Sequence, residues 1–242
     1  MSHCAECLAL ATDPRRVRTS KYWQCRGQVA HFCAFTAQIR SDIRPTVSVT
    51  LGSLPESTTE PMTGTLHLAA WNLNHRTGKK AIPPAVIHAI AALDIDVLVL
   101  TEFVDGDHQV HFKDSLKDIG FESLAVSVKA PRQNQVLIAA RTAMADDGLL
   151  PLPGHTEAAT TNWLHRRLPG LKLEVVGFRA PMYLAADDRT GYWNQVEGIA
   201  RAARDRRVIF LGDFNCDPFT DTRPCTQVFP RLQVDGFRLP EP

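Results

Sequence analysis

The stretch FLGDFNCD, residues 210–217, decides the fold of this chain. It continues the apolar residues Val208-Ile209, and a short apolar run of this kind predicts a buried strand. Gly212 lets the backbone turn tightly where a larger residue would crowd the site. Asp213, Asn215 and Asp217 then place oxygen atoms at the carboxyl end of the strand. Such oxygens suit a hard divalent cation, although an Asp-rich turn explains an isolated stretch equally well.

Two more apolar runs end in polar residues of the same kind. Residues 65–74 predict a strand that ends in Asn72 and Asn74, which share a face because alternate residues of a strand point the same way. Residues 95–100 predict a buried strand, and Glu102 follows it. A carboxylate there must be paired, protonated or metal-bound if it is buried. Each end alone has a simple structural explanation, but the repetition favours a shared site.

The rest of the chain mixes hairpins with strand–helix–strand units. Pro83-Pro84 predicts the start of a helix, and residues 192–206 predict an amphipathic helix. Pro169-Gly170 predicts a hairpin between strands at 163–168 and 171–176. Some strands are apolar throughout, as in a sheet that is covered on both faces. The pattern predicts an α/β protein with two packed sheets and helices outside them.

Composition limits the classes of function. Hydrophobic residues make up 44% of the 242 residues, which is enough for a real core, and the net charge is +1. This charge excludes a generally basic coat for nucleic acid but not a local basic groove. No apolar run reaches membrane-spanning length and the N-terminus does not read as a secretory signal, so we expect a protein of the cytoplasm without membrane contact. We also expect a monomer. In that reducing compartment the six cysteines need not form a disulfide framework.

Residues 1–62 differ from the rest of the chain. They carry four of the six cysteines: Cys4, Cys7, Cys25 and Cys33. The first pair could form half of a structural Zn²⁺ site, but the second pair is too widely spaced for a standard zinc ribbon. We therefore favour unliganded thiols over zinc. Residues 52–61 have the composition of a linker, so the sequence predicts an extension of low order over 1–62 and the main domain over 63–242.

Taken together, the three strand ends resemble the endonuclease/exonuclease/phosphatase superfamily of Mg²⁺-dependent phosphoesterases. The matching segments are Trp71-Asn72-Leu73-Asn74, Leu98-Val99-Leu100-Thr101-Glu102 and Gly212-Asp213-Phe214-Asn215, of which the last is the most specific. The resemblance covers about residues 65 to 218. It implies a four-layer α/β sandwich, in which two packed mixed sheets are flanked by helices and the active site lies at one edge of the sheets.

The resemblance also implies a role for each polar residue. Glu102 would hold Mg²⁺, or Mn²⁺ in its place, together with Asp213 and, through water, Asn74. Asn72 and Asn215 would orient the phosphate and the attacking water. Asp213 would also act as the general base, because phosphodiester cleavage needs an in-line water that loses a proton.

Two features depart from the family pattern. Arg179 stands where the family commonly has His or Tyr; it could grip a phosphate bidentately but cannot act as an acid at neutral pH. The family also ends in an Asp-His pair, whereas no such pair follows Asp217 and no histidine follows His165. We therefore expect a C-terminally truncated or diverged member that lacks its last strands and leaves a sheet edge unpaired. His75 is the only histidine placed to substitute, and we do not favour it.

The leading prediction is metal-dependent hydrolysis of phosphodiester bonds, by a nuclease or phosphodiesterase that acts on nucleic acid or a small phosphodiester. The missing Asp-His pair motivates a second prediction of a different class. In that alternative the chain is a non-catalytic remnant that binds a partner or a phosphate ligand.

Overall fold

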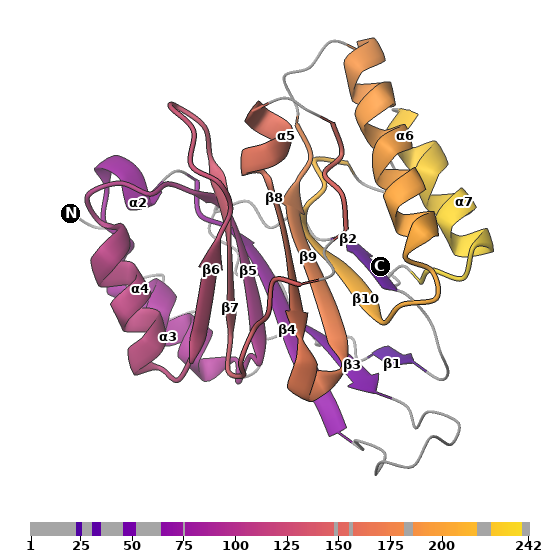
Figure 1. Cartoon of the computed structure of the whole chain (residues 1–242). Coiled ribbons are helices and arrows are strands. Elements are labelled where there is room, and N and C mark those ends of the chain that lie inside the picture. Colours follow the sequence, from indigo (N-terminus) through magenta and orange to yellow (C-terminus); the bar gives the residue numbers. More distant parts are fainter. Residues whose placement is uncertain are drawn as a thin grey trace, which may run out of the picture.

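Two β-sheets lie face to face in the computed structural model of the chain, and helices cover the outer side of each sheet (Figure 1). The structure describes residues 23–25, 31–34, 46–51, 64–74, 76–147, 150–154, 157–181, 186–216 and 224–238.

The first sheet has the strand order β1-β3-β4-β5-β7-β6, and the second has the order β2-β10-β9-β8. The strands of the first sheet are β1 (Trp23–Cys25), β3 (Thr46–Leu51), β4 (Gly64–Asn72), β5 (Val97–Phe103), β6 (Ser123–Val126) and β7 (Gln135–Ala140). The strands of the second sheet are β2 (His31–Ala34), β8 (Trp163–Leu168), β9 (Leu173–Arg179) and β10 (Val208–Asp213).

The helices lie between these strands in the chain and end with α7. They are α2 (Arg76–Lys79), α3 (Pro84–Ala92), α4 (Gln109–Asp118), α5 (Glu157–Thr161), α6 (Ala186–Ala202) and α7 (Val228–Val234), with short 3-10 turns at Pro169–Leu171 and Pro224–Gln227. Within the described residues, no helix combines the length and the apolar character needed to cross a bilayer.

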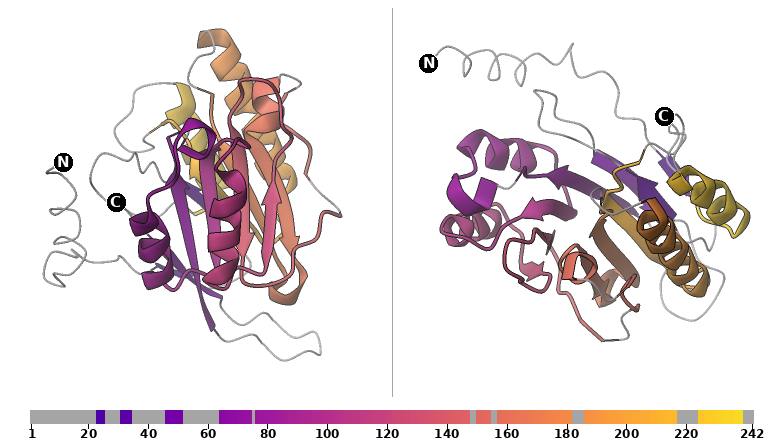
Figure 2. Two further views of the ribbon diagram at one scale, coloured as in Figure 1. Left: turned by 90° about the vertical axis from the view of Figure 1, so that its left-hand side faces the viewer. Right: turned by 90° about the horizontal axis from the view of Figure 1, so that it is seen from above.

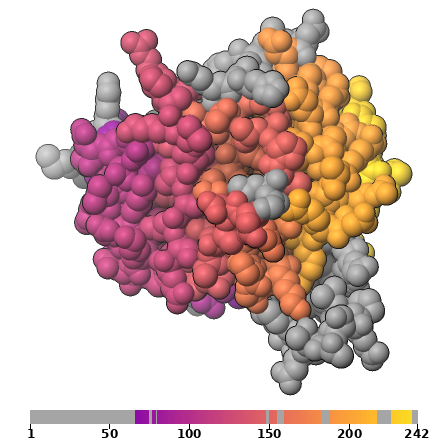
Figure 3. Space-filling view, viewed as in Figure 1, coloured from indigo at the N-terminus to yellow at the C-terminus, as the bar shows by residue number. Residues whose placement is uncertain are grey.

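Three clusters of buried apolar side chains, counted among the described residues, lie between the layers. The central cluster joins the two sheets and includes Val99 of β5 and Ile209 of β10. A second cluster, which includes Phe112, packs α3 and α4 on the first sheet. The third packs α6 and α7 on the second sheet through residues such as Trp193 and Phe210. Figure 2 shows the two helical layers on either side of the sheets, and Figure 3 shows α4 and α6–α7 on opposite flanks. The predicted four-layer sandwich is confirmed.

Side-chain alternation explains how one strand serves two of these interfaces. In β5, Val97 and Val99 face the layer between the sheets, whereas Leu98 and Leu100 pack under the helices. Every residue of the strand is therefore buried. A strand covered on both faces shows a continuous apolar run, which is why this segment could be recognised from its sequence.

Three short strands from the first 62 residues belong to the two sheets: β1 and β3 to the first, and β2 to the second. β3 pairs antiparallel with β4 and parallel with β1. β2 pairs in parallel with β10, with His31–Ala34 opposite Ile209–Gly212. The prediction of an unpaired edge after the last strand is therefore wrong, because β2 covers that edge of β10. The division into 1–62 and 63–242 stays a prediction. It would separate β3 from β4, although these two strands pair with each other.

The zinc alternative also stays a prediction. The backbone of Cys25 lies in β1 of the first sheet, and that of Cys33 lies in β2 of the second sheet. Cys4 and Cys7, and the side chains of the other two cysteines, lie outside the described residues.

A buried histidine on β8 links two elements of the second sheet. The Nδ1 atom of His165 accepts a 2.8 Å hydrogen bond from the backbone N–H of Leu150, so its Nε2 atom carries the proton and donates to Glu174 Oε2 at 2.9 Å. Arg206 donates to the same carboxylate at 2.9 Å. Burial lowers the pKa of His165 to about 4, because the attraction of Glu174 offsets only part of the desolvation of the imidazolium.

We expect β3 to be essential for stability, because it lies between β1 and β4. Val49 is opposite Trp23 on one side and Leu66 on the other. Proline cannot donate to a ladder inside a sheet, so Val49→Pro should lower the free energy of unfolding by about 2 kcal/mol or more. Urea denaturation measures the change, and Val49→Thr, which keeps the N–H and the β-branch, is the control. Equal unfolding midpoints for the proline variant and the parent would contradict the pairing.

We expect His165 to make the fold sensitive to acid. Its pKa is about 4 in the folded chain and near its ordinary value of 6.5 in the unfolded chain, so the unfolded state binds more protons between these values. The stability contribution is complete above pH 6.5 and is lost as the pH falls towards 4, by about 3 kcal/mol at most. Urea denaturation at a series of pH values should show that His165→Gln loses less free energy of unfolding between pH 6.5 and 4 than the parent does.

A matched control for this experiment is His88, which is exposed on α3. His88→Gln should leave the acid-dependent loss of stability as it is in the parent. If His165→Gln and the parent lost the same free energy between pH 6.5 and 4, the buried imidazole would not be the cause.

Candidate active site

The polar residues predicted at three strand ends meet at one end of the layer between the sheets. β4 is parallel to β5, and β9 is parallel to β10, so the carboxyl ends in each pair lie at the same edge. Asn72 continues the row of Leu68 and Ala70 on β4, and Asp213 continues the row of Ile209 and Leu211 on β10. These rows face each other between the sheets, so the polar residues take the last places on two apolar faces.

Asp213 is the most firmly positioned group of the site. Its Oδ2 atom accepts a 2.9 Å hydrogen bond from the Nδ2 of Asn72, and its Oδ1 atom accepts a 3.0 Å bond from the backbone N–H of Asn215. Asn72 is itself held, because its Oδ1 atom accepts from the backbone N–H of Asn74 at 2.8 Å. The Nδ2 of Asn215 donates to the carbonyl of Ala180 at 2.6 Å. The two asparagines therefore fix the direction of the Asp213 carboxylate.

The environment of Asp213 favours a proton acceptor. Burial raises the pKa of its carboxyl, since only 3% of the residue is exposed. The hydrogen bonds from Asn215 and Asn72 and the positive charge of Arg179 oppose this rise, whereas the charge of Glu102 adds to it. A carboxylate that is desolvated but held by donors is a stronger base than one in water.

An ion pair crosses from one sheet to the other at this edge. The Nη2 atom of Arg179, on β9, lies 2.9 Å from Oε1 of Glu102, on β5. The Nε atom of the same guanidinium lies 3.8 Å from Oδ2 of Asp213. These three side chains are buried, and Nε has no hydrogen-bond acceptor within the part of the chain that the structure describes. One guanidinium thus lies between two carboxylates.

Glu102 reaches this place through an irregularity in β5. The register with β7 shifts between Leu100 and Phe103, and Glu102 has a φ of 53°. Strict alternation would turn its side chain towards the helices, as it does for Leu100. The bulge and the left-handed backbone turn the chain locally, and such costly conformations cluster at functional sites.

Gly212 allows the closest approach between β9 and β10 at the site. Its φ is 148°, and a Cβ atom added there would lie 2.0 Å from the carbonyl oxygen of Phe178. No side chain fits at that distance. Gly212 therefore lets β10 deliver Asp213 directly beside the end of β9.

Comparison with known proteins agrees with this geometry. Residues 69–229 match the model of a protein family described as the Endonuclease/Exonuclease/phosphatase family. The chain belongs to the endonuclease/exonuclease/phosphatase family. Members of such a family hydrolyse phosphoesters, so membership supports phosphoester hydrolysis in general. A search of curated proteins found no matching relative.

Two solved structures are similar to this member of the family. One is the 3′ phosphatase NExo from Neisseria bound to a product DNA hairpin, with 18% identity, a TM-score of 0.54 and coverage of 69% of this chain and 70% of that chain. The other is the endonuclease domain of TRAS1, a telomere-specific non-LTR retrotransposon, with 17% identity, a TM-score of 0.42 and coverage of 70% of both chains. The likeness to NExo confirms the fold of the family.

The structure brings together most of the residues that the sequence singled out. Asn72 contacts Asp213, Asp213 lies beside Arg179, and Arg179 pairs with Glu102. Asn215 touches Asp213 through its backbone. The remaining predicted residue, Asn74, has an exposed side chain, and its backbone supports Asn72. The functional role of each residue stays a prediction.

Other residues named from the sequence are not part of the described site. His75 and Asp217 lie outside the described residues. His165 lies on the face of the second sheet that is turned away from the first, with Trp163 of the outer cluster. Cys216, next to Asn215, is in a disulfide, and the expectation that the six cysteines need not form a disulfide framework stays a prediction.

Two contributors to the site were not predicted. The backbone carbonyl of Ala180 anchors Asn215, and no side-chain signal could have shown this. Thr101, opposite Asn72 on the neighbouring strand, is buried, and its Oγ1 has no hydrogen-bond partner among the described residues. A threonine between an apolar run and Glu102 was a visible signal for a polar group inside this edge.

The donor atoms at this edge have the chemistry that a hard divalent cation needs. Two carboxylates, those of Glu102 and Asp213, and the amide of Asn72 lie together, and Mg²⁺ is commonly held by one or two carboxylates with water. The described residues contain no cluster of three or more His, Cys, Asp or Glu that could hold a metal alone. The residues therefore fit a cation that keeps much of its water, next to the guanidinium of Arg179.

We expect the fold of the site to fail when residue 212 gains a side chain. Gly212→Ala would push a Cβ into the Phe178 carbonyl at a φ that L-residues rarely adopt, and should lower the free energy of unfolding by about 2 kcal/mol or more. Gly198→Ala on α6 is the matched control, because nothing lies within 4 Å of the added Cβ. That change should stabilise by roughly 0.5–1 kcal/mol. Urea denaturation compares both, and a Gly212 variant as stable as the parent would contradict the close approach.

Proposed function

We propose that this chain hydrolyses phosphodiester bonds with the help of a divalent cation, and that Asp213 is the general base. The observation that carries the proposal is the buried carboxylate of Asp213, which is fixed by Asn72 and Asn215 at the same edge as Glu102 and Arg179. A base must be held still and must accept a proton near neutral pH. Burial, which raises the pKa of Asp213, moves it in that direction.

The protein groups divide the work of cleavage between them. Asp213 would accept the proton of the attacking water, while Asn72 and Asn215 keep its carboxylate in one orientation. Arg179 would bind a phosphoryl oxygen, since its buried Nε has no acceptor among the described residues. A guanidinium suits this role because its donors match the geometry of a phosphate. The two asparagines, which were predicted to orient the phosphate and the attacking water, would act on that water through Asp213, because both hold its carboxylate.

Glu102 and Asp213 would hold the divalent cation, with Asn74 contributing through water. Bound there, Mg²⁺ or Mn²⁺ would neutralise charge on the phosphoryl group. The support for this assignment is the donor set itself and the membership of the family.

We further propose a nucleic acid as the substrate. The support is that the similar structure of NExo is that of a 3′ phosphatase with a product DNA hairpin. The net charge of +1 means that the chain must bind a polyanion locally rather than through a generally basic surface. A phosphoesterase-like chain that binds a phosphate ligand without turnover is the second candidate, because the buried Nε of Arg179 could donate to a phosphate without any chemistry.

We expect removal of either carboxylate to abolish cleavage. Asp213→Asn keeps the shape but cannot accept the proton, and Glu102→Gln weakens the cation site, so each should lower kcat at least about 100-fold. The measurement is Mg²⁺- or Mn²⁺-dependent cleavage of DNA, RNA and bis(p-nitrophenyl) phosphate by purified protein. The parent rate should fall as the pH drops, because protonation removes the base.

The matched control is Glu197→Gln. Glu197 is also a buried carboxylate paired with an arginine, Arg231, but it lies on α6 away from the site. That variant should keep the parent rate once its folding is confirmed by circular dichroism. Cleavage that survived in both site variants would refute the proposal, and phosphate binding without any turnover in the parent would favour the second candidate.

A further inference from the structure

Arg179 occupies a place between two carboxylates where a metal-dependent phosphoesterase needs a cation. We propose that its guanidinium is an internal counter-cation that competes with the divalent cation for Glu102. The inference rests on the proposed function, because it concerns the same cation site. It adds a determinant of metal affinity that lies outside the three strand-end motifs.

The ion pair is buried and close. The Nη2–Oε1 distance between Arg179 and Glu102 is 2.9 Å, and 9% of each side chain is exposed. Asp213 lies beside the same guanidinium, with 3.8 Å between its Oδ2 and the Arg179 Nε and 4% of its side chain exposed. At such burial, charges attract more strongly than in water, so displacing the guanidinium carries a cost for any incoming ion.

Charge counting explains the direction of the effect. The carboxylates of Glu102 and Asp213 carry two negative charges and Arg179 carries one positive charge, so these three groups together have a net charge of −1. A divalent cation that enters the site therefore meets a net charge of −1, because the guanidinium repels it while the two carboxylates attract it. Without Arg179 it would meet both carboxylates unopposed, and would bind more tightly.

A phosphate group would reverse this competition. The Nε of Arg179 is buried and lacks an acceptor among the described residues, so the guanidinium has an unused donor directed towards Asp213. A phosphoryl oxygen would satisfy it and draw the guanidinium from Glu102. The cation and the phosphate would then strengthen each other's binding, since the phosphate frees the carboxylate that the cation uses.

The test is the affinity of the full chain for Mn²⁺ alone, measured as the loss of the free-ion signal in electron paramagnetic resonance. Arg179→Met should bind Mn²⁺ about tenfold more tightly or better than the parent, because the competing charge is gone. Arg231→Met is the matched control: it also removes an arginine from a buried carboxylate, Glu197, but away from the site. Its affinity should equal that of the parent.

Two more measurements protect the test against misfolding. Arg179→Met removes the positive charge between two buried carboxylates, so its thermal midpoint should fall, and Mn²⁺ should raise that midpoint more than it raises the parent's. Glu102→Gln combined with Arg179→Met relieves the repulsion and should restore folding. This double variant should bind Mn²⁺ no more tightly than the parent, because the contested carboxylate is gone.

The outcomes separate this inference from the proposed function. If the parent and Arg179→Met bind Mn²⁺ equally, the counter-cation inference fails and the cation site stands. If neither binds Mn²⁺, both fail. If Arg179→Met does not fold, the double variant still tests the inference. If the double variant binds Mn²⁺ about tenfold more tightly than the parent or better, the inference is overturned, because Glu102 would not be the contested ligand.

Discussion

A single guanidinium balances two buried carboxylates where the two sheets meet. Arg179 comes from the second sheet and Glu102 from the first, so their 2.9 Å ion pair joins the sheets at the edge that carries the polar residues. Below this edge the contact between the sheets is apolar and includes Val99 and Ile209. Removing one partner of a buried ion pair costs far more than losing a surface ion pair.

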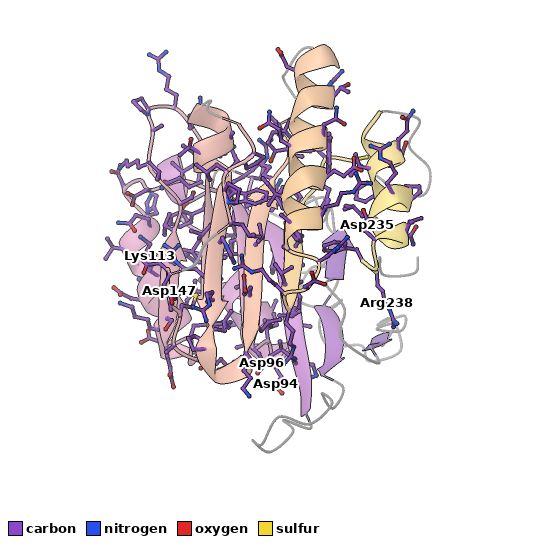
Figure 4. All side chains as sticks on the ribbon, turned by 45° about the vertical axis from the view of Figure 1, so that its right-hand side comes forward. Asp94, Asp96, Lys113, Asp147, Asp235 and Arg238 are labelled. Atoms are coloured by element: carbon purple, nitrogen blue, oxygen red, sulfur yellow. The ribbon has the colours of Figure 1, made fainter. Side chains whose placement is uncertain are left out.

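The strands that are covered on both faces could be predicted from the sequence. The strands β5, β7 and β10 are buried along their whole length and each contains a continuous apolar run, and the hairpin of β8 and β9 surrounds Pro169–Leu171. The helix placed at residues 192–206 begins earlier, since α6 spans Ala186–Ala202. The strands of the first 62 residues could not be recognised, because β1 and β2 have three and four residues and gain their order only by pairing with distant strands. Acidic residues alone were also no guide: Asp94 and Asp96 lie at the opposite, amino end of β5 (Figure 4).

The identity of the site residues could be predicted, but their contacts could not. Alternation along a strand places Asn72 and Asp213 on facing rows, and this follows from sequence. The contact between Glu102 and Arg179 depends on a φ of 53° and a register shift in β5, which no residue type announces. The same holds for Asn215, whose φ of 48° lets its backbone N–H reach Asp213. Long-range packing selects these conformations, so they were invisible in the local sequence.

Stability and metal affinity are opposed at residue 179. Each left-handed residue at the site carries a conformational cost, and two buried carboxylates at one edge repel each other. An arginine between them stabilises the chain without a metal, because a buried charge that is paired and hydrogen-bonded costs less than one left alone. The same arginine makes the edge less attractive to a divalent cation. A side chain without charge would reverse both effects, so the residue at the end of β9 sets whether the carboxylates at this edge are neutralised by an arginine or by a cation taken from solution.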